Sequence, residues 1–221
     1  MAENDLATLI RSIVTKELVK HSDNLVPVTL SNRHMHISHE HLNALFGEDY
    51  ELTPLQTLSQ PGEYVCKETV DVVGPKGTLY DVRILGPIRE HSQIEVSIGD
   101  TYALGVTPLI RLSGDLSSSP SVHVIGPRGA TRIECAVIVA ARHIHATPED
   151  ARRLQLTDGQ VVSVRFHGER GIIFDEVIVR VNPNYCLELH LDFEEGNAAG
   201  VKNGDLGEII KDYQATFCRV V

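Results

Sequence analysis

One short motif occurs twice in this chain, about 109 positions apart, and it limits the possible folds more than any other feature. Arg-His-x-His occupies residues 33–36 and again residues 142–145, each time after an apolar run. In an extended strand the side chains at i and i+2 point to the same face, so each copy can direct two imidazoles at one point. Neutral imidazole is the commonest protein ligand for zinc. The repeat therefore predicts metal binding by His34, His36, His143 and His145.

The segments around the two motifs also match. Residues 38–46 have the pattern of a short capped helix ending at Gly47, and Thr147 with Pro148 has the pattern of a helix start after the second motif. Each motif follows a strand-like run. The repeat predicts a mainly β fold of two similar small barrels capped by short helices, with the two histidine pairs facing each other across the join.

Alternation of apolar and polar residues predicts the strands. Gly-Pro-x-Gly turns at 74–77 and 126–129 separate several of them, and Asp158-Gly159 and Asn203-Gly204 are typical of tight turns. Residues 50–62 and 112–121 are expected to be loops, the first long enough to suggest a functional role. The expected strands cover residues 25–37, 69–73, 80–85, 93–98, 122–125, 138–140, 161–166, 172–181, 186–191 and 207–211.

Residues 4–20 have the pattern of an amphipathic helix that ends in a polar cluster before the first strand. Two interpretations stay open. The helix can pack on its own domain, or it can be a detachable targeting or docking peptide. Its apolar residues are Leu6, Leu9, Ile10, Ile13, Val14 and Leu18.

Composition excludes several classes. The net charge of −10, from 20 basic and 30 acidic residues, argues against a general nucleic-acid binder. No apolar run is long enough to span a membrane, and no signal peptide is visible, so an intracellular protein is expected. The four cysteines are scattered singly and are expected to be buried, reduced thiols: Cys66, Cys135, Cys186 and Cys218.

Other polar residues near the motifs have ordinary interpretations. His39 and His41 lie on the predicted helix, where i and i+2 diverge, so they are expected to face solvent. Arg33 and Arg142 point away from the histidines on a strand and are expected to form structural salt bridges. On pattern alone, Glu95 is an outward-facing strand residue.

Five stretches in order resemble the phosphate propanoyltransferase family, the phosphotransacylases of bacterial microcompartments, over residues 26 to 210. They are Ser-Asn-Arg-His-Met-His-Ile-Ser, Lys-Glu-Thr-Val-Asp-Val-Val-Gly-Pro-Lys-Gly, Ser-Gly-Asp-Leu, Ala-Ala-Arg-His-Ile-His-Ala-Thr-Pro-Glu-Asp and Leu-Glu-Leu-His-Leu-Asp.

The resemblance implies two intertwined barrels, with a helix at residues 1–22, one barrel from 23–32 and 141–212, and the other from 33–140. It also implies an acyltransferase with a dinuclear zinc site that converts a short-chain acyl-CoA, propanoyl-CoA foremost, and phosphate to acyl phosphate and coenzyme A. One zinc is then held by His34, His36 and Glu95, and the second by His143, His145 and His190.

By the same resemblance Arg89 is the phosphate-binding catalytic residue, although on pattern alone it is a surface arginine paired with Glu90. One departure is Gln56, where many members of the family carry a lysine. The residues that the resemblance assigns to coenzyme A are Ser31, Arg83, Leu85, His190 and Asn197.

The expected partners are coenzyme A, phosphate and acyl phosphate, together with microcompartment shell proteins that bind residues 1–20 in the bacterial cytoplasm. A homo-oligomer of two or more chains is expected, with no nucleic acid and no membrane. Two other functions stay open at this point. One is a dinuclear metal-dependent hydrolase that has no need for coenzyme A. The other is a non-catalytic metal-binding or shell-docking protein.

Overall fold

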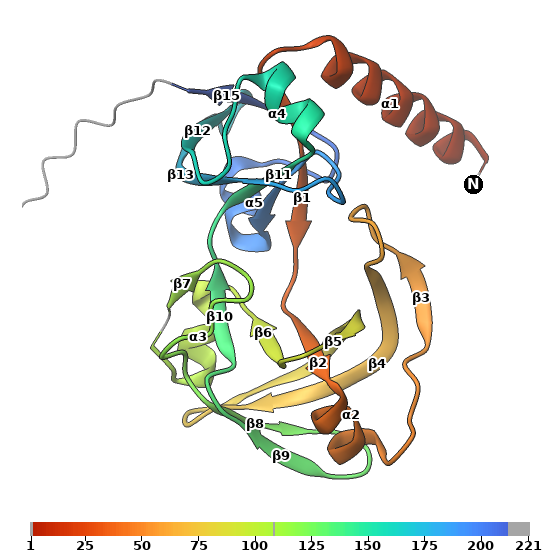
Figure 1. The fold of residues 1–221 in the computed structure, drawn as a ribbon, viewed down its shortest axis with the longest axis vertical. Coiled ribbons are helices and arrows are strands. Elements are labelled where there is room, and N and C mark those ends of the chain that lie inside the picture. Colours follow the sequence, from red (N-terminus) through yellow and green to blue (C-terminus); the bar gives the residue numbers. More distant parts are fainter. Residues whose placement is uncertain (1, 108, 212–221) are drawn as a thin grey trace, which may run out of the picture. The chain divides into compact units, whose positions relative to one another are not determined.

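The structure is a computed structural model, and it describes residues 2–107 and 109–211. Its contacts divide the chain into two compact units. The terminal unit consists of Met1–Leu30 and Arg142–Val221, and the central unit consists of Ser31–Ala141. Both are built mainly from strands, with short helices at the strand ends (Figure 1), which confirms the predicted fold class.

The terminal unit is a closed barrel of six strands in the order β1-β14-β11-β13-β12-β15. Three helices, α1, α4 and α5, belong to the same part of the chain (Figure 1). The strands are β1 (Leu25–Ser31), β11 (His143–Ala146), β12 (Val161–Phe166), β13 (Ile172–Val181), β14 (Glu188–Asp192) and β15 (Leu206–Ile210), and the helices are α1 (Ala2–His21), α4 (Pro148–Leu154) and α5 (Phe193–Ala199).

The central unit is a nine-stranded sheet in the order β7-β10-β6-β2-β5-β4-β8-β9, with β3 paired to β4. Its helices are α2 (His39–Phe46) and α3 (Ile98–Leu104). The strands are β2 (His34–Ser38), β3 (Pro54–Thr57), β4 (Tyr64–Val73), β5 (Thr78–Arg89), β6 (Gln93–Glu95), β7 (Ile110–Arg111), β8 (Val122–Ile125), β9 (Ala130–Ile133) and β10 (Val137–Ala140).

Each unit has its own apolar core, formed by the alternate residues of its strands. In β11, Ile144 is fully buried in the terminal core, and in β2, Met35 and Ile37 are fully buried in the central core. Neighbouring side chains on a strand point to opposite faces. The histidines that alternate with these apolar residues therefore face away from the apolar core. Core packing thus fixes which way each histidine pair points.

The two histidine strands have the same neighbours. In the central unit β2 lies between β5, which is parallel to it, and β6, which is antiparallel. In the terminal unit β11 lies between β13, parallel, and β14, antiparallel. The following helices, α2 and α4, begin at Ser38 and Thr147, whose side chains accept a backbone N–H of the first turn. The predicted repeat of strand and helix is therefore confirmed.

Two helices were not predicted. The chain after β6 was expected to stay extended to Ile98, but α3 begins there, capped by Ser97 with Asp100 in a capping box. Helix α5 follows β14 in the same way, with Asp192 as its cap. Both helices carry a Ser or Asp cap with an acid three residues later, which is the sequence signature of a helix start. The prediction missed this signature because it followed the alternating pattern of the preceding strand.

The two Gly-Pro-x-Gly turns pack against helix ends. The backbone N–H of Lys76 donates to the carbonyl of Leu104 at the end of α3, and that of Arg128 donates to the carbonyl of Leu45 in α2. A Cβ at Gly74 would lie 2.3 Å from the Leu104 carbonyl oxygen. Glycine is required there by this close approach, and the turn gives the helix carbonyls hydrogen-bond partners.

Three smaller expectations were wrong. The loop expected over residues 50–62 contains β3, which pairs antiparallel with β4. His41 is half-buried, and its Nδ1 lies 2.8 Å from Ser92 Oγ, so the ring is not solvent-facing. Of the cysteines, Cys66 is buried but Cys135 and Cys186 are exposed, and Cys218 lies outside the described residues.

Helix α1 confirms the predicted N-terminal helix. Arg153 of α4 binds its last turn, because one guanidinium nitrogen donates to the Val19 carbonyl at 2.7 Å and also to the Ser22 carbonyl. The side chains of Leu6 and Leu9 lie outside the described part of the chain, and the rest of the apolar stripe is about half exposed: Ile10, Ile13, Val14 and Leu18. No helix within residues 2–107 and 109–211 is long and apolar enough to cross a membrane.

Candidate metal sites

The central histidine set consists of His34, His36 and Glu95. In the described residues it is the one group of three His, Cys, Asp or Glu residues whose donor atoms all lie within 4.8 Å of one another. His34 Nε2 is 3.6 Å from Glu95 Oε2, and His36 Nε2 is 4.0 Å from Glu95 Oε1. Two imidazoles and a carboxylate at this spacing are donors that zinc accepts.

Strand register assembles this set. Glu95 lies directly opposite His34 in the antiparallel pair of β2 and β6, so its side chain points inward, contrary to the prediction from pattern alone. The Nδ1–H of His34 donates to the carbonyl of Asn32 at 2.8 Å, which leaves the Nε2 lone pair facing Glu95. Burial lowers the pKa of His36 to about 3, with smaller effects of His34 and Arg89 in the same direction, so its imidazole is neutral.

Two residues that the sequence did not single out support Glu95. The Gln93 amide donates to Glu95 Oε1 at 2.6 Å and to Ser113 Oγ at 2.8 Å, and its carbonyl accepts from the Gly114 backbone N–H. Gln93 is nearly fully buried. The sequence could have indicated this role, because Gln93 stands two residues before Glu95 on one strand and both side chains therefore lie on the same face.

Arg89 ends β5 and is part of the same neighbourhood. Its guanidinium bonds to Glu63 Oε1 at 3.1 Å and to Ser113 Oγ at 3.2 Å, not to Glu90 as the pattern suggested. Ser113 thus joins Arg89 to Gln93. The Arg89 side chain is 31% exposed, so the guanidinium can still reach a ligand from solvent.

The residues assigned to coenzyme A lie in both units. Arg83 and Leu85 lie on β5 directly across from His34 and His36, and therefore on the face of the histidines. Arg83 donates to the Lys67 carbonyl at 2.6 Å. Ser31 ends β1 and is half-buried, Asn197 is exposed on α5, and Gln56 is exposed on β3.

The terminal histidine set consists of His143, His145 and His190. The ring centroids lie 4.7 to 4.9 Å apart. His190 lies opposite His143 in the antiparallel pair of β11 and β14, as Glu95 lies opposite His34 in the central unit. The set therefore has three imidazoles where the central set has two imidazoles and a carboxylate.

His145 has no hydrogen-bond partner for its ring nitrogens among the described residues. Its side chain is buried, and neither Nδ1 nor Nε2 has a hydrogen bond. Tyr185 stacks on the ring at a centroid distance of 4.1 Å, and the Arg180 guanidinium lies over Tyr185. Burial lowers the pKa of His145 to about 2, and His143, His190 and Arg180 add to the shift. A buried imidazole without a partner costs about 1–3 kcal/mol, and a metal ion is a partner that would remove this cost.

The arginines beside the motifs form the predicted salt bridges. Arg33 binds Asp100 of α3 at 2.9 Å, and Arg142 binds Glu195 of α5 at 3.1 Å. Both acids stand at the third position of their helices. Arg33 thus links the start of β2 to α3, the helix after Glu95. Arg142 links the start of β11 to α5, the helix after His190.

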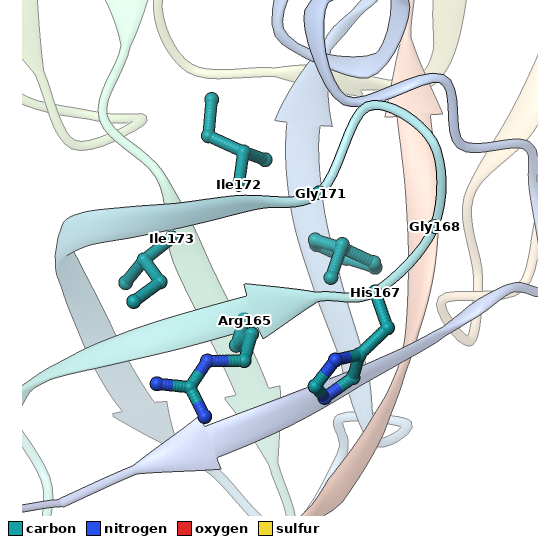
Figure 2. Close-up of a pocket in the computed structure, with 7 residues that line it drawn as sticks. Arg165, His167, Gly168, Gly171, Ile172 and Ile173 are labelled. Atoms are coloured by element: carbon teal, nitrogen blue, oxygen red, sulfur yellow. The ribbon is translucent and has the colours of Figure 1, made fainter.

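A cavity of about 300 Å³ lies on the hairpin of β12 and β13, formed by residues outside both sets (Figure 2). Arg165 and His167 project to the same side of this hairpin. Both pair with Glu208 of β15, His167 at 3.1 Å and Arg165 at 3.9 Å. All three side chains are at least 34% exposed, so these ion pairs lie on the outer surface of the unit.

Comparison with known proteins identifies the family of this chain. A family model described as phosphate propanoyltransferase matches residues 27–202. The phosphate propanoyltransferase of Listeria monocytogenes is 42% identical over 96% of this chain and 99% of its own length. That of Thermotoga maritima is 49% identical over 83% of this chain and 88% of its own length. The chain is therefore an enzyme of the acyltransferase class. It belongs to the phosphate propanoyltransferase family.

Proposed function

We propose that this enzyme transfers a short-chain acyl group, propanoyl foremost, between coenzyme A and phosphate. In the forward direction phosphate oxygen forms a bond to the acyl carbon, the thioester C–S bond breaks, and the products are acyl phosphate and the coenzyme A thiol. Membership of the family carries this proposal. The buried central histidine set supports it, because it offers a place where an anionic substrate can meet a cation.

The two histidine sets fit zinc, and we propose one ion in each unit. The central set offers two neutral imidazoles and a carboxylate, and the terminal set offers three imidazoles, one of them buried without a hydrogen-bond partner. Zinc bound by three protein ligands keeps an open position, where it can polarise a carbonyl or stabilise a thiolate.

Arg89 is suited to bind phosphate. A guanidinium presents planar paired donors that match phosphate oxygens. Its present partners, Glu63 and Ser113, hold it beside Gln93 and so beside the central set. Phosphate bound there has its oxygens fixed for attack on the acyl carbon, and no side-chain nucleophile is needed.

We propose that coenzyme A binds along the face of the central histidine set. Arg83 and Leu85 share that face, so one supplies a cation for a phosphate and the other an apolar contact. Ser31 and Asn197 are proposed as further contacts, together with His190. Gln56 carries no charge, so a phosphate at that position depends on other residues.

Thiol release from propanoyl-CoA, measured with and without phosphate, tests the function. Release that depends strictly on phosphate, with formation of acyl phosphate, is the expected result. Phosphate-independent release would identify a metal-dependent hydrolase instead. Zinc binding without release from any acyl-CoA would identify a metal-binding protein.

We further propose that α1 binds shell proteins of a microcompartment in the bacterial cytoplasm, and that the enzyme is a homo-oligomer. The exposed stripe of α1 supports the first proposal, because such a helix gains stability when a partner covers it. A chain that begins at Asn24 should keep its zinc and turnover but lose shell association. A fall in melting temperature of several degrees would show that α1 is part of the folded domain instead.

A further inference from the structure

In the central histidine set, the third residue accepts a hydrogen bond from a neighbour on its own strand. On β6, Glu95 lies opposite His34, and Gln93 lies opposite His36. The Gln93 amide donates to Glu95 Oε1 at 2.6 Å. A carboxylate that holds a metal needs donors for its other lone pairs, and an amide two residues away on the same strand provides one.

The terminal unit has the same arrangement with donor and acceptor exchanged. On β14, His190 lies opposite His143, and Glu188 lies opposite His145. Glu188 therefore occupies the position in this ladder that Gln93 occupies in the central one. Here the third residue of the set is an imidazole, which donates a hydrogen bond, and its neighbour on the strand is a carboxylate, which accepts one. His190 Nε2 lies 3.0 Å from Glu188 Oε2.

Glu188 is itself held in place. The residue is 7% exposed, and its Oε1 accepts a hydrogen bond from the hydroxyl of Thr29 on β1. With one oxygen on Thr29 and the other on His190, the carboxylate is fixed between two strands of the barrel. A buried carboxylate is costly unless hydrogen bonds or cations compensate it, and these two hydrogen bonds supply such compensation.

We propose that Glu188 is the positioning residue of the terminal zinc site, an inference that rests on the proposed function. Its carboxylate holds the proton of His190 on Nε2, which places the lone pair of the neutral ring on Nδ1. The ring is thus fixed in one tautomer and one orientation for the ion. Glu188 also supplies the negative charge that the central set obtains from Glu95.

A first experiment needs no variant. In a spectrum that correlates ring protons with ring nitrogens, zinc-free protein should show His190 as the tautomer protonated on Nε2, with assignment by loss of its signals in His190→Asn. A His190 ring protonated on Nδ1 instead would overturn the proposal, because Glu188 would then have no N–H to accept.

A second experiment measures zinc alone. In competition with a chromogenic chelator, Glu188→Leu should weaken one of two zinc affinities by about 10–100-fold and leave the other unchanged. Glu188→Gln keeps a carbonyl oxygen that accepts from His190, so it should restore part of the lost affinity. Thr29→Val should have a smaller effect in the same direction, and Glu149→Gln, an exposed acid in the same unit, should have none.

Cobalt in place of zinc gives a readout that a purely structural role would not change. Glu188→Gln should alter the visible absorption of one of two bound cobalt ions while the circular dichroism of the protein stays unchanged. Wild-type affinities and cobalt spectra in folded Glu188→Leu and Glu188→Gln would overturn the proposal. A wild-type chain that binds no zinc would instead contradict the proposed function itself, and this outcome is visible before any variant is made.

Discussion

The central and terminal histidine sets share one backbone plan but differ in the side chains at two matching positions, Glu95 against His190 and Gln93 against Glu188. Glu95 and His190 stand at the same register position opposite the first histidine of their pair. The central set places its donors within 4.8 Å of one another, while the terminal set has three imidazoles with ring centroids 4.7 to 4.9 Å apart. The comparison teaches that strand pairing supplies the scaffold, and that two positions of the ladder decide where the carboxylate of each site stands.

Each set also has its own arginine. Arg89 bonds to Glu63 and Ser113 beside the central set, whereas Arg180 lies over the ring of Tyr185 beside the terminal set. A guanidinium held by hydrogen bonds at its edge can exchange them for phosphate oxygens. One stacked on an aromatic ring is held by its face. The two guanidinium groups are therefore held in different ways.

The largest effects are expected from the histidines. His34→Ala and His143→Ala should each lower bound zinc from about two ions per chain toward one, and each should abolish turnover, because two remaining protein ligands make a poor chelate. Metal analysis and thiol release from propanoyl-CoA measure both. His39→Ala, an exposed histidine on α2, is the control. Full zinc content in both variants would refute the assignment of the sets.

Arg89→Ala tests which site binds phosphate. We expect a fall of about tenfold or more in kcat/KM for phosphate, while the affinity for coenzyme A changes little, because the guanidinium faces oxyanions. Steady-state kinetics with each substrate varied in turn measure this. Arg132→Ala removes an exposed arginine that pairs with Glu134 and should leave the kinetics unchanged. Unaltered phosphate kinetics in Arg89→Ala would place the arginine outside the site.

The salt bridges of Arg33 and Arg142 should contribute differently to the free energy of unfolding. Asp100, the partner of Arg33, has a side chain that is 8% exposed, while Glu195, the partner of Arg142, is 24% exposed. Arg33→Ala leaves the more buried acid unpaired and should cost about 1–2 kcal/mol, whereas Arg142→Ala should cost about 1 kcal/mol or less. Denaturant unfolding measures both against Arg132→Ala. A larger loss in Arg142→Ala would reverse this ranking.

The smallest effect concerns thiol reactivity. Burial raises the pKa of Cys66 to about 11, and Cys135 is exposed in the same unit. The thiolate is the reactive form, so at pH 8 Cys66 should be alkylated far more slowly than Cys135, and its rate should keep rising as the pH approaches 11. Mass spectrometry of the labelled peptides separates the two. Equal rates at pH 8 would show that the central core opens readily.

Sequence patterns predicted the features whose signals are local. The cap at Thr147, the helix after each motif and the strand before residues 126–129 follow from turn residues and alternation, and the structure confirms them. Helices α3 and α5, each seven residues long, begin within three residues of a strand end, and they were missed because neither has a proline at its start, as α4 has in Pro148. In so short a helix, the capping residues carry most of the signal, and periodicity carries little.

The sequence by itself determined the duplicated motif, the mainly β class and the direction of each histidine pair, because a strand alternates its faces and the residues between the histidines are apolar. Only the tertiary structure decided what meets those histidines. Glu95 and Gln93 on β6, and His190 and Glu188 on β14, reach their sets through pairing with residues 43 to 61 positions away in the chain. Register of that kind is set by core packing across the whole sheet, and no local pattern contains it.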